Sequence, residues 1–373
     1  MAKVILIASL AESLLNFRGD LIRHLIQRGH EVVTIAPDGP PGLDLALAEW
    51  GVRRLSIGLQ RTGSNLIADL RVLFELRRLL RAEQPDVVLA YTIKPVVYGI
   101  LAARWAGVPR RAAMITGLGF AFAPPAGMRQ RITRAAARSL YRAAMACTDT
   151  VFFQNPDDEA DFRQAGLLRP AQRIVQTGGS GVNLDRFATL PLPDGPLRFL
   201  MIARLLIDKG VREYLQAAAL ARRERPDLTF HLVGPFDVHP SAVPQAEVDA
   251  AVAQGTVVYH GPVADVRPHL ADCHVYVLPS YREGTPRSVL EAMAVGRAVI
   301  TTDAPGCRET VVPGDNGLLV APQRADALAQ AILQIANLPY TEVTRMAARS
   351  RALAVSRFDV ALVNQHIADA LAL

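Results

Sequence analysis

Residues 275–303, VYVLPSYREGTPRSVLEAMAVGRAVITTD, contain a strand, a loop, a helix and a second strand in direct succession. The two ends, VYVLPS and AVITTD, are short apolar runs of the kind that form buried β-strands. Between them, Thr285 is a suitable N-cap and Pro286 suits the first helical position, with the helix ending at Gly296. This segment therefore predicts two strands joined by a crossover helix.

The same alternation runs through the whole chain and predicts an α/β protein. Apolar strands separated by amphipathic helices are typical of parallel sheets that are covered on both faces. The predicted strands are KVILIAS, EVVTIAP, VRRLSI, DVVLAYT, RAAMIT and TVFFQN in the first half, and LRFLMIA, LTFHLVG, TVVYHG, VYVLPS, AVITTD and NGLLVAP in the second. The Gly- and Pro-rich stretch TGGSGVNLDRFATLPLPDGP separates them as a linker. We therefore expect two Rossmann-like domains, residues 1–178 and 179–355.

Length and cysteine content restrict the class of protein further. A chain of 373 residues is too long for one ordinary core. The three cysteines are scattered without paired spacing, which favours a reducing compartment and argues against a disulfide framework or a zinc site. Neither the apolar N-terminal run nor the longest uncharged run, residues 112–128, is long enough to span a bilayer. The sequence predicts a cytoplasmic protein that does not cross a membrane.

Positive charge is concentrated in the first half of the chain. Residues 1–178 contain 23 Lys and Arg against 15 Asp and Glu, and no acid lies between Asp86 and Asp149. Such a region attracts polyanions, namely nucleic acid, an anionic membrane or a phosphorylated substrate. Stacking aromatic residues are not interleaved with these cations, which argues against nucleic acid.

Charged side chains cluster in the loops that follow predicted strands, where open α/β sheets bind ligands. Arg204 and Lys209 follow one strand, and Glu283 and Glu291 flank the helix start after another. A helix N-terminus and two cations suit a diphosphate, and the carboxylates suit the hydroxyls of a sugar nucleotide. No Asp-x-Asp pair or His/Cys cluster is present, so we expect no metal. On spacing alone, the alternative is that both glutamates are solvated residues without a ligand.

Several of these segments together carry a family resemblance. The series ARLLIDKG, PSYREGTPRSVLEAMAVGRAVITTDAPGCRETV and GDNGLLV, with NFRGDLIRHLIQRGHEV near the start, resembles the retaining glycosyltransferases of family 4. The resemblance covers nearly the whole chain. It implies the GT-B fold, in which two Rossmann-like domains face a cleft, and a C-terminal helix, residues 356–373, that returns to the first domain.

The resemblance also implies roles for individual residues. Arg204, Lys209 and Glu283 would be catalytic, with the two cations binding the donor diphosphate and Glu283 holding the sugar hydroxyls. Glu291 would accept hydrogen bonds from the ribose. The backbone of Gly19 would approach the phosphates when the cleft closes. The full expected donor site comprises Gly19, Arg204, Lys209, Glu283, Gly284, Thr285, Arg287 and Glu291.

Two positions depart from the family pattern. Thr116 stands in MITGLGF where many relatives have a histidine, which puts a catalytic imidazole there in doubt. Thr285-Pro286 stands where relatives often have Phe-Gly, and the proline removes one amide that could have met a phosphate. We hypothesise that Arg287 compensates as an additional cation.

The first domain is expected to bind the acceptor through Asn16, Arg18, Lys94 and Thr116. The segment YTIKPVVYG resembles the branch of the family that extends polyprenyl-diphosphate-linked glycans. A basic helix face with Arg131, Arg134, Arg138 and Arg142, preceded by a loop with Phe120 and Phe122, predicts peripheral contact with the anionic inner face of the cytoplasmic membrane. Alternatively, the two phenylalanines pack in the core and the arginines are only solvated.

The predicted function is thus transfer of a hexose or N-acetylhexosamine from a nucleoside-diphosphate sugar, expected to be a UDP-sugar, to a lipid-linked glycan, without a cofactor or metal. Three alternatives stay open at this point. They are a glycosyltransferase with a soluble acceptor, a non-catalytic sugar-nucleotide-binding protein of the same fold, and a sugar-nucleotide epimerase, which would need no acceptor.

Overall fold

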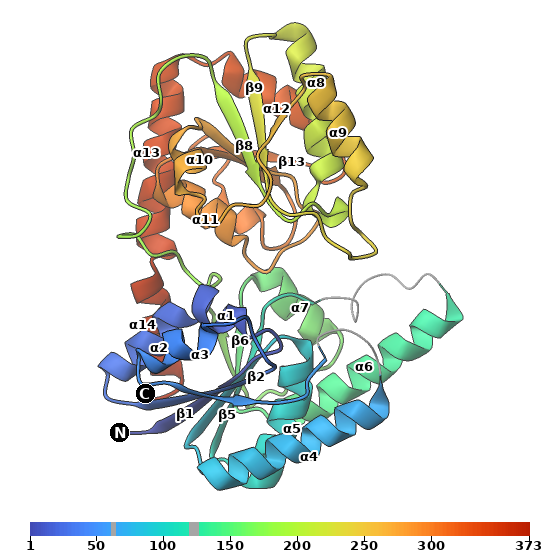
Figure 1. The fold of residues 1–373 in the computed structure, drawn as a ribbon, viewed down its shortest axis with the longest axis vertical. Helices are drawn as coiled ribbons and strands as arrows, with labels where there is room; N and C mark the ends of the chain where they lie inside the picture. Colours follow the sequence, from blue (N-terminus) through green and yellow to red (C-terminus); the bar gives the residue numbers. More distant parts are fainter. Residues whose placement is uncertain (61–64, 119–126) are drawn as a thin grey trace. The chain divides into compact units, whose positions relative to one another are not determined.

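A computed structural model describes residues 1–60, 65–118 and 127–373. The chain forms two compact units, each built around one parallel β-sheet (Figure 1). The first unit comprises Met1–Ser180 and Val360–Leu373, and the second comprises Gly181–Asp359. The unit boundary thus falls two residues after the predicted one, and residues 356–359 belong to the second unit instead of the returning helix.

The sheet of the first unit has the strand order β3-β2-β1-β4-β5-β6-β7. Its strands are β1 Lys3–Ile7, β2 Glu31–Ala36, β3 Arg53–Ser56, β4 Val87–Tyr91, β5 Arg110–Ile115, β6 Thr150–Phe153 and β7 Arg173–Gln176. Six of them were predicted. The edge strand β7 was not among the predicted strands, because its sequence RIVQ has only two apolar residues between a charged and a polar end, both of which are exposed.

Helices cover both faces of this sheet (Figure 1). They are α1 Glu12–Asn16, α2 Gly19–Gln27, α3 Leu43–Ala48, α4 Leu66–Glu83, the π-helix η1 Pro95–Gly99, α5 Ile100–Ala106, α6 Met128–Ala146, α7 Pro156–Gln164 and α14 Val360–Ala370. Alternate residues of β1 serve the two layers: Ile5 and Ile7 pack towards α4 and α5, whereas Val4 and Leu6 pack towards α2 and α14. The last helix therefore contributes to the core of the first unit.

The sheet of the second unit has the order β10-β9-β8-β11-β12-β13. Its strands are β8 Arg198–Ile202, β9 Thr229–Val233, β10 Val258–Tyr259, β11 Val275–Leu278, β12 Ala298–Thr302 and β13 Gly317–Val320. The helical elements are η3 Ile207–Lys209, α8 Val211–Glu224, α9 Gln245–Ala253, α10 Arg267–Ala271, α11 Arg287–Ala294, η4 Arg308–Thr310, α12 Ala325–Ala336 and α13 Tyr340–Arg357. All six strands predicted for this half are present.

The start of α11 differs from the prediction. Pro286, not Thr285, is the N-cap, and its extended backbone (φ −74°, ψ 109°) precedes the first helical residue, Arg287. The Thr285 hydroxyl donates to the Gly284 carbonyl, while the Pro286 carbonyl accepts from the N–H groups of Val289 and Leu290. Pro286, which has no N–H, therefore stands one position before the first helical residue and not at that residue, as the sequence suggested.

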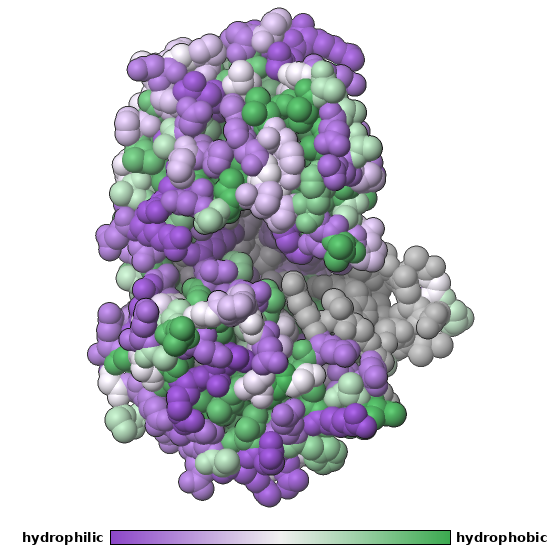
Figure 2. Space-filling model, viewed as in Figure 1, coloured by the Kyte–Doolittle hydropathy of each residue, from purple (hydrophilic) through white to green (hydrophobic). Residues whose placement is uncertain are grey.

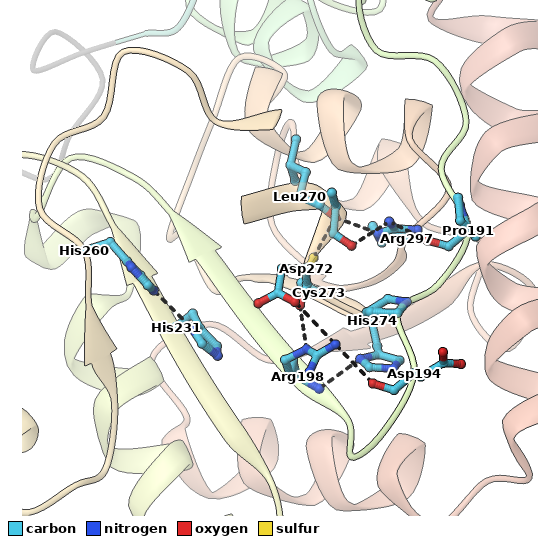
Figure 3. Close-up of polar contacts among 12 residues, drawn as sticks. Pro191, Asp194, Arg198, His231, His260, Leu270, Asp272, Cys273, His274 and Arg297 are labelled. Atoms are coloured by element: carbon cyan, nitrogen blue, oxygen red, sulfur yellow. Dashed lines mark hydrogen bonds and ion pairs between the residues drawn. The ribbon is translucent and has the colours of Figure 1, made fainter. Parts of the chain in front are cut away.

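A fully buried arginine joins the strand-helix framework of the second unit (Figure 3). Arg297 donates to the carbonyls of Leu190, Pro191, Leu270, Ala271 and Gly296 at 2.7–3.2 Å. No carboxylate is among these partners, so backbone dipoles compensate the guanidinium charge. Arg297 therefore holds the linker, at Leu190 and Pro191, against α10 and the turn before β12.

Polar residues dominate the visible surface of both units, with apolar residues in small groups among them (Figure 2). None of the helices in the described ranges combines the length and the apolarity that crossing a bilayer requires.

Candidate functional site

Three loops meet at the carboxyl edge of the second sheet, because they follow neighbouring strands. They come after β8, β11 and β12, which are adjacent in the sheet. The Tyr281 N–H donates to the Asp208 carbonyl at 2.9 Å, and the Glu283 N–H donates to the Pro305 carbonyl at 3.0 Å. These bonds fix the loop of residues 279–286 between its two neighbours.

Two glycines allow this close packing. Gly210, with φ +75°, faces the Pro279 carbonyl, and a Cβ at position 210 would lie 2.1 Å from that oxygen. Gly306, with φ +79°, faces the backbone of Glu283, where a Cβ would lie 2.2 Å from the carbonyl oxygen. Any larger residue would displace the loop that carries Glu283.

Lys209 and Glu283, both predicted site residues, are in direct contact. The Lys209 ammonium donates to Glu283 Oε1, and the Ser280 hydroxyl donates to the same oxygen at 2.8 Å. The side chains of Lys209 and Glu283 are 25% and 13% exposed. A cation and a carboxylate at a strand edge, both partly accessible, can serve a diphosphate and a sugar hydroxyl respectively. Ser280 was missed by the sequence analysis, although it follows β11 directly.

Arg287 and Glu291 form a second pair on the first turn of α11. Arg287 Nε donates to Glu291 Oε1 at 3.0 Å across one helical turn. Burial raises the pKa of Glu291, and the positive charges of Arg287 and Arg186 partly offset that effect. The alternative that Glu291 is a solvated surface residue is therefore wrong: its side chain is 13% exposed.

Arg204 also lies in the loop after β8, and its ion-pair partner is Asp237. Its Nη1 donates to Asp237 Oδ2 at 2.9 Å, and the Arg204 side chain is 46% exposed. Asp237 belongs to the loop after β9. Desolvation raises the pKa of its carboxyl group, but the hydrogen bonds from Arg204 and from the His239 N–H together outweigh this effect and lower the pKa. No motif pointed to Asp237 as the partner of Arg204, and the predicted role of Arg204 stays a prediction.

The predicted residues of the first unit surround the carboxyl ends of β1 and β4. Asn16 ends α1, and Arg18 is buried, with its guanidinium 4.9 Å from the centre of the Tyr91 ring and 3.2 Å from the Ser180 hydroxyl. Gly19 starts α2, and a Cβ there would lie 3.1 Å from the Trp50 ring. The close contact with Trp50 inside this unit therefore also favours glycine at position 19, in addition to the predicted approach to the phosphates.

Lys94 is already engaged by a carboxylate of the same unit. Its ammonium donates to Asp69 Oδ1 at 2.8 Å, and the Tyr98 hydroxyl donates to Asp69 Oδ2 at 3.0 Å. Asp69 comes from α4, 25 residues earlier in the chain. This contact joins α4 to the π-helix, so a structural role for Lys94 accompanies its predicted acceptor role.

A strained threonine lies at the same edge and was not predicted. Thr92 has φ +68°, a conformation that is unfavourable for a β-branched side chain, and its hydroxyl is 2.7 Å from that of Ser9. Such strain is concentrated at functional sites. Thr116, one of the predicted acceptor residues, directly follows β5 and is half-buried.

The predicted membrane residues are only partly described. Phe120 and Phe122 lie outside the described residues. Arg131, Arg134, Arg138 and Arg142 belong to α6, where Arg131 and Arg142 are exposed and Arg138 is half-buried. In the part of the chain that the structure covers, no group of three or more His, Cys, Asp or Glu side chains could hold a metal ion.

Family models match both units. Residues 17–179 match the glycosyl transferase 4-like domain, and residues 196–337 match the glycosyl transferases group 1 domain. One relative is the N,N'-diacetylbacillosaminyl-diphospho-undecaprenol alpha-1,3-N-acetylgalactosaminyltransferase of Campylobacter jejuni, which is 30% identical over 86% of this chain and 85% of its own length. Another is the UDP-Gal:alpha-D-GlcNAc-diphosphoundecaprenol alpha-1,3-galactosyltransferase of Escherichia coli, 26% identical over 73% of this chain and 72% of its own.

Solved structures agree on the fold. A glycosyltransferase from Rickettsia africae has a TM-score of 0.79 at 17% identity, covering 99% of this chain and 97% of its own. HepE from Anabaena, in complex with UDP and glucose, has a TM-score of 0.77 at 20% identity, and the match covers both chains completely. At this identity the likeness establishes the GT-B fold alone. Family models and sequence relatives together show that the chain belongs to the group 1 glycosyltransferases with a family 4-like N-terminal domain.

Proposed function

We propose that this glycosyltransferase moves a hexose or N-acetylhexosamine from a UDP-sugar to a polyprenyl-diphosphate-linked glycan in the assembly of a surface polysaccharide or glycan. The names of the Campylobacter and Escherichia relatives support the acceptor, because both describe transfer to a diphospho-undecaprenol-linked sugar. The second name and the UDP complexes of HepE support a UDP-sugar donor.

The contact between Lys209 and Glu283 is the observation that carries the proposal. Without a donor, each charged group neutralises the other. A bound UDP-sugar would replace this contact: its diphosphate would take the ammonium, and a sugar hydroxyl would donate to the carboxylate. Ser280, which donates to the same carboxylate oxygen, would keep Glu283 oriented during the exchange.

The first turn of α11 would receive the remainder of the donor. The positive end of the helix dipole favours an anion there, and Arg287 adds a cation where Pro286 supplies no N–H. Glu291, which is largely buried beside Arg287, would accept hydrogen bonds from the ribose. Its raised pKa is compatible with this role, because a neutral ribose hydroxyl can pair with either form of the carboxyl group.

The main requirement of the transfer reaction is stabilisation of the leaving group. When the anomeric C–O bond breaks, negative charge grows on the departing diphosphate, so fixed cations lower the energy of the transition state more than that of the ground state. Lys209 and Arg204 would supply this charge without a metal. We expect the anomeric configuration to be retained, with the departing phosphate helping to take the proton of the acceptor.

The acceptor would be bound by the first unit, which carries most of the positive charge. Asn16, Arg18, Lys94 and Thr116 are the proposed acceptor residues, and the basic helix α6 would contact the anionic inner face of the cytoplasmic membrane that holds the lipid.

The test combines donor binding with transfer. Thermal unfolding is measured with UDP, GDP and ADP in the presence of EDTA, for the wild type and for Lys209→Ala. We expect UDP alone to raise the unfolding temperature, and to do so less in Lys209→Ala. Labelled UDP-sugars are then supplied with a polyprenyl-diphosphate-linked sugar or with the same free sugar. Label in the lipid fraction supports the proposal; label only in soluble product, or no response to UDP, contradicts it.

A further inference from the structure

The outer face of α4 has a composition that a water-exposed helix rarely has. Among the residues of α4 whose burial is described, the exposed ones are Ile67, Leu70, Arg71, Phe74, Arg78, Arg81 and Ala82. All of them are apolar or positively charged. They recur at spacings of three and four residues, so they form one stripe along the helix.

The carboxylates of α4 lie away from this stripe. Asp69 is buried against Lys94 and Tyr98, and Glu83 pairs with Lys3 and Arg53. Glu75 is only partly exposed. The acidic side chains of α4 therefore either pair with other residues of the protein or lie outside the exposed stripe.

Helix α5 extends the apolar part of the stripe. Trp105 is 49% exposed, and its ring centre lies 6.4 Å from that of Phe74, which is 57% exposed. Ile67 and Leu70 are also large exposed apolar residues, at 65% and 44%. Arg104, next to Trp105, is exposed as well. Helices α4 and α5 pack side by side on one face of the first sheet (Figure 1), so both contribute to one continuous surface.

We propose that the surface formed by Ile67, Leu70, Phe74 and Trp105, with Arg71, Arg78, Arg81 and Arg104, inserts into the interface of an anionic lipid bilayer. Apolar and aromatic side chains would enter the boundary between headgroups and acyl chains, while the guanidinium groups bind lipid phosphates. Tryptophan is favoured at that depth. The proposal assigns the insertion to α4 and α5, beyond the basic face of α6, and rests on the proposed function only for the biological reason to bind lipid.

The positive charge of this surface favours an anionic lipid bilayer, and not a second copy of the chain, as its binding partner. In a two-fold symmetric dimer the stripe would meet itself, so arginines would face arginines without a carboxylate between them. An anionic lipid surface is complementary to the same arrangement, and each cation near it strengthens binding about fivefold.

The test uses the full-length protein without donor or acceptor, so its outcome is independent of catalysis. Flotation is measured with vesicles of phosphatidylcholine alone and of an equal mixture with phosphatidylglycerol. We expect binding to the anionic vesicles only. Phe74→Ser with Trp105→Ser should weaken it by about tenfold or more, and Arg71→Gln with Arg78→Gln by about 25-fold. Leu45→Ser on α3, an exposed apolar residue in the opposite layer, is the matched control and should change nothing.

Depth of insertion is measured by fluorescence. The chain has two tryptophans, Trp50 and Trp105. Brominated phospholipid in the anionic vesicles should quench the emission of the wild type, and the quenching should disappear in Trp105→Phe, which retains an aromatic ring and serves as the folded conservative variant. Equal quenching in Trp105→Phe, no binding to anionic vesicles, or a concentration-dependent dimer that Phe74→Ser abolishes would each overturn the proposal.

Discussion

Each unit contains a lysine paired with a carboxylate that also accepts a hydroxyl hydrogen bond, yet the two pairs are built differently. In the first unit, Lys94 contacts Asp69 on a helix that covers the sheet, with Tyr98 as the hydroxyl donor. In the second, Lys209 contacts Glu283 between two loops at the carboxyl edge, with Ser280 as the donor. We therefore expect the pair held between two loops to open for a donor more readily than the pair that joins a covering helix to η1.

The largest effect expected from this comparison concerns catalysis. Lys209→Ala should lower kcat/KM for the donor by about 100- to 1,000-fold, as expected for loss of one group that stabilises transition-state charge. Steady-state kinetics with the UDP-sugar measure it. Lys94→Ala, at a proposed acceptor residue, is the comparison variant and is measured at saturating acceptor; an equal loss of donor kcat/KM in Lys94→Ala would break the comparison.

For the free energy of unfolding, we expect the opposite order, with the larger effect at the pair in the first unit. Asp69→Asn leaves the half-buried Lys94 without its carboxylate, so the free energy of unfolding should fall by about 2–3 kcal/mol. Glu283→Gln should change it by less than about 1 kcal/mol, because the lysine partner there reaches solvent. Urea unfolding of both variants provides the measurement, and the reverse order would contradict our assignment.

A buried histidine in the second unit makes the free energy of unfolding depend on pH. Burial, assisted by the charge of Arg198, lowers the pKa of His274 to about 4 (Figure 3). The unfolded chain therefore binds the proton first, and the stability contributed by neutral His274 is complete above about pH 6.5 and is lost as the pH falls towards 4. At pH 5 the loss should be about 2 kcal/mol.

The variant His274→Gln tests this dependence, since its amide oxygen can still accept from the Arg198 N–H that His274 Nδ1 accepts from. We expect urea unfolding of the variant to vary less between pH 7 and pH 5 than that of the wild type. A residual slope remains from His231 and His260, whose pKa values burial also lowers. An unchanged pH dependence of the unfolding free energy would show that His274 does not cause the loss of stability.

The smallest effect is expected at Arg287, whose partner Glu291 lies on its own helix. Arg287→Ala should raise the donor KM about tenfold, equivalent to about 1.4 kcal/mol, because one of several groups that meet the donor is lost. Arg287→Lys should recover part of that loss. Unchanged KM and kcat in Arg287→Ala would end the hypothesis that this residue compensates for Pro286.

Much of this arrangement could be predicted from the sequence, and the reason is local. Twelve of the strands fall within short β-favouring runs that could be recognised without knowledge of their neighbours. Lys209 and Glu283 could be placed at one edge because each follows a strand of a parallel sheet. Features that depend on packing were not predictable: the contact of Arg204 with Asp237, the pairing of Lys94 with Asp69, and the left-handed backbone of Thr92.

The path of the chain has a consequence for the order in which the protein is made. The second unit interrupts the sequence of the first, and its two ends are joined where the Val182 N–H donates to the Phe358 carbonyl at 2.8 Å. The first unit's core includes Val363 and Ile367 from the final helix. During synthesis, the N-terminal sheet must therefore wait for its last helix until residues 181–359 have left the ribosome, and the unit that starts first is completed last.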